Sequence, residues 1–127
     1  MTQNRVFNVE KRGDAIIAEI VESQLQGETM AEFLRLELLQ IVETESPQMV
    51  VVSFRNVKIV STSIVSFLLF VNKRFSGMGI PLKLGAMSDS LRHIFQTLRL
   101  DGSVFKIYST VDEALAGHKG PVTYEDV

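Results

Sequence analysis

The chain of 127 residues contains no cysteine and no tryptophan, and its two histidines are His93 and His118. The absence of cysteine excludes disulfide bonds, thiolate metal sites and a cysteine nucleophile, and it fits a cytoplasmic location. The two histidines are not at a metal-ligand spacing, and neither has an adjacent motif of nucleophile and orienting carboxylate. We therefore expect no catalytic residue, no metal site and no cofactor, and we expect that the chain is not an enzyme.

The chain also lacks a long apolar run and a cluster of like charge. Its longest uninterrupted apolar stretch, residues 67–71, is far too short to cross a membrane. The 13 Lys and Arg residues are balanced by 15 Asp and Glu residues, for a formal net charge of -2. This balance gives no general attraction to nucleic acid or to an anionic membrane. Since the first ten residues are polar and do not form a signal peptide, a cytoplasmic protein is expected.

The remaining composition is that of an ordinary globular protein, with 46% hydrophobic and 22% charged residues. The length predicts one domain over residues 1–127, with its core at about 5–117 and a polar tail at 118–127. Apolar runs bounded by turn and cap residues predict the order β-β-α-β-α-β-α-β-α. The predicted fold is an α/β fold in which about four helices pack on a mixed sheet. The predicted strands cover residues 6–9, 15–21, 49–54, 81–86 and 104–108, and the helices cover about 28–43 and 62–76 and begin again after Ser88 and Thr110.

The two longer predicted helices have different apolar patterns. In the first, Met30, Leu34, Leu38 and Ile41 form a stripe at helical spacing, which Phe33 and Val42 widen. The second, at 62–76, is apolar on more than one stripe. It is therefore expected to be deeply buried, or to have half of its surface covered by a partner.

The most specific segment follows the predicted central strand. The run of residues 50–54 leads into a loop with Val57 and Val60, and three hydroxyl residues follow at once: Ser61, Thr62 and Ser63. This segment resembles the STAS family, the sulfate-transporter and anti-sigma-factor-antagonist domains, and the resemblance extends over about residues 5–117. Further on, Leu98, Leu100, Asp101 and Phe105 are similar to the family's late pattern, and residues 110–115 are similar to its closing helix.

The resemblance implies a switch at the start of the second helix. In the family, a serine at this position is phosphorylated by an anti-sigma factor that is a serine/threonine kinase, and a phosphatase reverses the step. Thr62 occupies that position and keeps a hydroxyl, with Ser61 and Ser63 as alternative acceptors. The chain departs from the family's motif in two places. Ser61 replaces the aspartate, and Ile64 replaces a glycine, which would add bulk where a partner approaches.

The resemblance predicts a regulatory protein-binding module, an antagonist that binds an anti-sigma factor. The residues expected to contact the partner are Asn56, Lys58, Ser61, Thr62, Ser63, Ser66 and Ser88. Residues 61–63 are alternatively a plain helix cap, since serine and threonine are favoured there for hydrogen bonding alone. The competing function is a scaffold or self-assembling protein, for example a homodimer, in which an exposed Phe67, Phe70 or Phe75 would mark the contact. A third hypothesis, a small-ligand site or an enzyme activity, would require a polar pocket with converging titratable groups.

Overall fold

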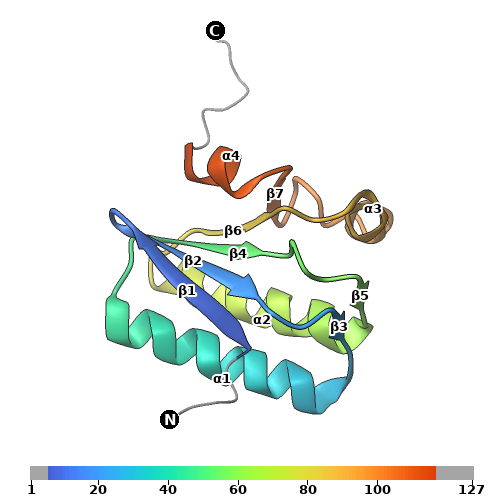
Figure 1. Ribbon diagram of the computed structural model, residues 1–127, viewed down its shortest axis with the longest axis horizontal. Helices are drawn as coiled ribbons and strands as arrows, with labels where there is room; N and C mark the ends of the chain where they lie inside the picture. The colour runs from blue at the N-terminus through green and yellow to red at the C-terminus, as the bar shows by residue number, and fades with distance from the viewer. Residues whose placement is uncertain (1–5, 117–127) are drawn as a thin grey trace, which may run out of the picture.

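In the computed structural model, which describes residues 6–116, helices and strands alternate around one main sheet (Figure 1). The strands are β1 (Phe7–Arg12), β2 (Ala15–Ile20), β3 (Gln24–Leu25), β4 (Met49–Ser53), β5 (Ile59–Val60), β6 (Leu82–Gly85) and β7 (Lys106–Tyr108). The helices are α1 (Gly27–Glu45), α2 (Thr62–Gly77), α3 (Asp89–Thr97) and α4 (Val111–Ala116). The predicted α/β fold with a mixed sheet and four helices is confirmed. The predicted tail at 118–127, which includes His118, lies outside the described residues.

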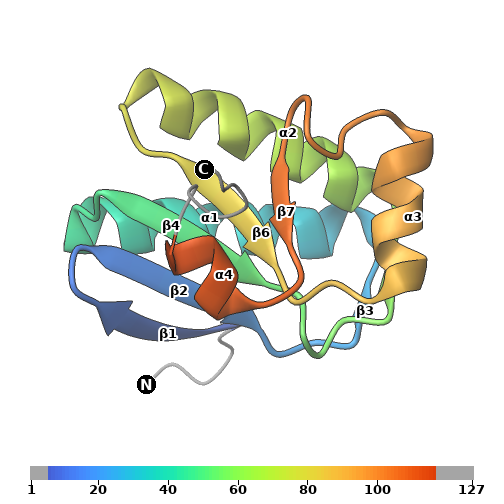
Figure 2. The same cartoon turned by 90° about the horizontal axis from the view of Figure 1, so that it is seen from above.

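The main sheet has five strands in the order β1-β2-β4-β6-β7. β1 and β2 form the predicted antiparallel hairpin around Gly13, whose φ of 61° suits a tight turn. The other neighbours in this sheet pair in parallel, and the helices that connect them cross from one strand to the next. Because β4 and β6 are parallel, their carboxyl ends lie on the same side of the sheet. The helices α2 and α3 begin on that side (Figure 2).

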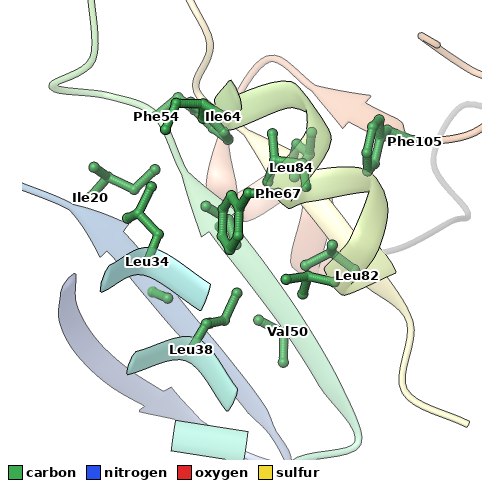
Figure 3. Packing of buried hydrophobic residues seen from close by; sticks show 14 of the residues in the cluster. Ile20, Leu34, Leu38, Val50, Phe54, Ile64, Phe67, Leu82, Leu84 and Phe105 are labelled. Carbon is green, nitrogen blue, oxygen red and sulfur yellow. The ribbon is translucent and has the colours of Figure 1, made fainter. Parts of the chain in front are cut away.

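Most of the core lies between the sheet and the α1–α2 layer (Figure 3). The strands alternate in the usual way, so Val50 and Val52 of β4 face these helices, while Val51 faces the other side of the sheet. Leu34 and Leu38 of α1 and Ile64 and Leu68 of α2 are each 0% exposed. α4 covers part of the opposite face, where the buried cluster is small: Ile17, Val51 and Ala114.

Several details differ from the sequence predictions. The first strand, predicted at 6–9, is β1 and extends to Arg12. The loop at 55–60 contains β5, which pairs in parallel with β3 to form a separate two-stranded sheet. Strands of two residues are too short to show a periodic apolar pattern. The strand predicted at 104–108 begins only at Lys106, because Val104 N–H and Phe105 N–H both donate to the Leu100 carbonyl in a turn. Phe33 does not join the stripe of α1, since it is 55% exposed.

Candidate functional site

The predicted site lies at the start of α2, beyond the end of the central strand β4. Ser61 occupies the N-cap position with extended backbone, and its carbonyl accepts hydrogen bonds from Ile64 N–H and Val65 N–H. The Ser61 side chain does not cap α2. It instead accepts a hydrogen bond of 3.3 Å from the backbone N–H of Gly27, the first residue of α1. The helix-cap interpretation is therefore wrong for the Ser61 side chain, which connects the starts of two helices.

The hydroxyl of Thr62 is placed differently from that of Ser61. Thr62 is the first residue of α2 and is exposed. Among residues 6–116, its side chain has no hydrogen-bond partner. The first turn of α2 also lacks an acidic residue, so no carboxylate within the helix occupies the positive end of its dipole. The structure thus presents the Thr62 hydroxyl to solvent beside free helix-end amides.

Ser63 and Ser66 face a shallow groove of about 380 Å³ between α1 and α2. Its other lining residues are Glu28, Ala31, Glu32, Arg35 and Phe67. Arg35 is already bonded to the Glu32 carboxylate, and its guanidinium carbon lies 5.7 Å from the centre of the Phe70 ring. A phosphate on Ser63 would therefore meet the Glu28 and Glu32 carboxylates beside an arginine that is already paired.

The loop before α2 is held to the strands by polar contacts. The Asn56 side-chain amide donates to Glu19 Oε2 and to the Ile20 carbonyl, both at 3.1 Å. The Arg55 guanidinium contacts the same Glu19 carboxylate at 2.9 Å. The backbone N–H of Lys58 donates to the Ser23 carbonyl at 2.7 Å, and the Lys58 side chain is exposed. Asn56 therefore positions the loop that leads to α2, a role that its place in the sequence did not reveal.

Ser88 precedes α3 and not α2, although α3 is at the same end of the molecule as the start of α2 (Figures 1 and 2). Its hydroxyl caps α3 by accepting a hydrogen bond of 3.2 Å from Leu91 N–H. Ile64 also differs from expectation. Its side chain is fully buried in the core, so the residue that stands for the family's glycine adds no bulk to the surface.

A second hollow, of about 430 Å³, lies on the opposite face of the sheet between the ends of β2 and β4 and the start of α4. The charged side chains that line it pair with one another. Arg12 contacts Glu10 at 2.7 Å and Asp112 at 3.4 Å, and these contacts raise the pKa of the Arg12 guanidinium. Arg55 is paired with Glu19. The hollow therefore gives no support to the small-ligand hypothesis.

Within residues 6–116, no group of three or more His, Asp or Glu side chains is arranged to hold a metal ion. In the same range, no helix is both long and apolar enough to cross a membrane. Burial raises the pKa of Tyr108, which lies on β7 away from the start of α2.

The element order and the five-stranded sheet define a class of small α/β domains with a mixed sheet. The STAS domain model matches residues 7–114, and the chain belongs to this family. No curated protein is similar enough in sequence to match.

The fold is shared with solved structures of low sequence identity. A Thermotoga maritima protein assigned as an anti-sigma factor antagonist superposes with a TM-score of 0.75 at 15% identity, covering 87% of this chain and 92% of that one. An RsbS variant from Moorella thermoacetica superposes with a TM-score of 0.71 at 14% identity, again covering 87% of this chain and 92% of that one. The phosphorylated form of SpoIIAA, a cell fate determinant of Bacillus, superposes with a TM-score of 0.64 at 16% identity, covering 87% of this chain and 96% of that one.

Proposed function

We propose that this chain is a bacterial regulatory module of the anti-sigma-factor-antagonist type. Its partner is an anti-sigma factor that is also a serine/threonine kinase, and its binding is controlled by phosphorylation of Thr62. The module acts in the cytoplasm as one domain, has no catalytic activity of its own, and is reset by a phosphatase. It contacts neither nucleic acid nor membrane directly.

The observation that carries this proposal is the difference among three adjacent hydroxyls. Thr62 is exposed at the helix start, whereas Ser61 accepts a bond from Gly27 and Ser63 lies in the groove beside two glutamates. A kinase must reach the acceptor oxygen, so exposure favours Thr62. A protein of the same fold, SpoIIAA, has a structure in the phosphorylated form, which supports phosphorylation as the switch.

The helix start also explains how a phosphate can switch binding without unfolding the domain. A phosphoryl group adds a charge of about -1.5 to -2 and three acceptor oxygens. The first amides of α2 and its dipole tolerate an anion at this end. The fold is therefore kept, while the exposed surface around Asn56, Lys58 and Ser66 gains charge where the partner binds. Ser88, at the start of α3, stays a predicted contact residue, although its hydroxyl is already occupied as the cap of that helix.

The test is phosphorylation of the full chain by anti-sigma kinases from the genome that encodes it. The chain is incubated with each kinase and ATP, and the sites are mapped by mass spectrometry in the original sequence and in Thr62→Ala, Ser61→Ala and Ser63→Ala. We expect one phosphate that is lost only in Thr62→Ala. A phosphate that persists in Thr62→Ala, or no phosphate with any kinase despite stable binding, would contradict the proposal.

A further inference from the structure

The outward surface of α1 and α2 has an apolar band that the fold leaves uncovered. Four large side chains form it: Phe33 is 55% exposed, Leu36 is 52%, Leu69 is 38% and Phe70 is 44%. By contrast, Phe67 and Phe75 of α2 are buried in the core. We call the surface formed by Phe33, Leu36, Leu69 and Phe70 the helical face.

The four side chains are at the same height along the two helices. Because each helix connects two parallel strands in succession, α1 and α2 run in the same direction (Figure 1). The contact of Arg35 with the Phe70 ring fixes their relative height, with the middle of α1 beside the middle of α2. The band therefore crosses the helical layer from Phe33 on the side of α1 away from α2 to Leu69 on the far side of α2.

The charges of the two helices are opposite. α1 has five glutamates, at 28, 32, 37, 43 and 45. Glu32 pairs with Arg35, Glu37 accepts from Val6 N–H and Glu45 pairs with Lys11, so among the described residues Glu28 and Glu43 supply the unpaired negative charge of α1. α2 has no acidic residue, and its charges are those of Lys73 and Arg74. A surface with one acidic and one basic half is complementary to itself when it is turned by 180°.

We propose that the helical face binds a second copy of this chain. The two-fold axis runs parallel to the helices, so that α1 of each copy lies on α2 of the other. Under this rotation each residue keeps its position along the helix axis, while the α1 side of one copy comes to face the α2 side of the other. The rotation therefore places Phe33 against Leu69 and Leu36 against Phe70, and it brings the acidic helix of one copy onto the basic helix of the other.

The size of the face is that of a weak dimer. A helix of 19 residues is about 28 Å long, and two adjacent helices are about 20 Å wide. Each copy would therefore contribute roughly 500 Å², and the total of about 1,000 Å² is at the lower limit for a specific interface. We expect a reversible dimer that forms at roughly tens of micromolar.

Sedimentation equilibrium of the full chain without any partner tests the dimer separately from the phosphorylation switch. Between about 1 and 300 µM, the mass should rise from 14.2 kDa towards twice that value. Leu36→Gln and Phe70→Gln should each raise the dissociation constant about ten-fold or more, because each removes an exposed anchor of the band. The matched control Ile94→Gln, an exposed apolar residue on α3, should change it less than about two-fold.

Disulfide trapping tests the arrangement, because the chain has no cysteine of its own. Phe33→Cys and Leu69→Cys are prepared separately, and each is oxidised alone and then in an equal mixture. A cross-linked dimer should form in the mixture only, because a disulfide requires Cα atoms within about 7 Å and each single variant places its cysteines on opposite sides of the axis.

Three results would overturn the proposal. The first is a mass that stays at 14.2 kDa over the whole concentration range, which would leave the face for a different protein or for solvent. The second is a dimer that Leu36→Gln and Phe70→Gln leave intact. The third is cross-linking of Phe33→Cys alone as fast as in the mixture, which would place α1 on α1.

Discussion

The starts of α2 and α4 are alike in sequence and different in structure. At α4, the Thr110 hydroxyl accepts a hydrogen bond of 3.0 Å from Glu113 N–H, and the Glu113 carboxylate accepts one from Ser109 N–H. At α2, the Ser61 side chain points away to Gly27 of α1, and the Thr62 hydroxyl is exposed. The Thr110 hydroxyl therefore stabilises its own helix, while the Thr62 hydroxyl remains exposed at the start of α2.

At the start of α2, this difference separates the residues that stabilise the fold from the residue that we propose as the phosphate acceptor. Ile64 is buried in the core, Ser61 connects two helices, and Thr62 faces solvent. If the comparison holds, substitutions should affect the free energy of unfolding in that order, while only Thr62 should control phosphorylation.

The largest effect is expected from Ile64→Ala. The change removes a side chain that is 0% exposed and leaves a cavity beneath α2, which should lower the free energy of unfolding by about 3 kcal/mol. Urea denaturation followed by circular dichroism measures this loss. Ile64→Val, which deletes one methylene, is the matched control and should cost about 1 kcal/mol. Equal and small losses in both variants would show that Ile64 is not a core residue.

A smaller effect is expected from Thr110→Ala at the start of α4. The substitution removes the side-chain acceptor for Glu113 N–H, and loss of such a cap costs about 1 kcal/mol. Thr110→Ser keeps the oxygen and should recover most of the stability in the same denaturation experiment. If the serine variant were as unstable as the alanine variant, the cap would not be the cause.

Ser61→Ala should cost less than Thr110→Ala, although both residues precede a helix. Ser61 loses only the exposed bond of 3.3 Å with Gly27 N–H, so we expect a loss of about 0.5 kcal/mol. The two alanine variants should be compared under one set of denaturation conditions. A cost for Ser61→Ala above that for Thr110→Ala would reverse the comparison between the two helix starts.

The smallest effect on stability is expected from Thr62→Ala, within about 0.5 kcal/mol of the original chain, because the side chain is exposed. The same variant should lose phosphorylation completely. Thermal unfolding and mass spectrometry on one preparation measure both quantities. Thr62→Ser, which keeps the hydroxyl, should restore the phosphate. A destabilisation above 1 kcal/mol in Thr62→Ala would mean that the hydroxyl has a structural role.

The sequence predicted the features that depend on local pattern. The stripe of Leu34 and Leu38 predicted α1, and the nearly continuous apolar run of β4 predicted a strand buried on both faces. The pairing of β3 with β5 was missed, because it depends on two-residue strands that are far apart in the chain. The exposure of Phe33 was also missed, because a helical stripe has no sharp border.

For the candidate site as well, the sequence predicted the local features and missed those that depend on tertiary contacts. The resemblance placed the hydroxyls at the start of the second helix, and the structure confirms that location. The sequence left open which hydroxyls serve as a cap, because the answer depends on Gly27, 34 residues away from Ser61. The hydrogen bond of Asn56 to Glu19 and the position of Ser63 in the groove depend on tertiary packing in the same way.

The central claim is that phosphate on Thr62 controls binding to an anti-sigma factor. Its most direct test is calorimetric titration of one anti-sigma kinase with three forms of the full chain: unphosphorylated, phosphorylated, and Thr62→Ala after the same kinase treatment. We predict that phosphorylation weakens binding by about 100-fold or more, because the added charge meets the contact surface, and that Thr62→Ala binds like the unphosphorylated form. Equal affinities for the phosphorylated and unphosphorylated forms would contradict the account.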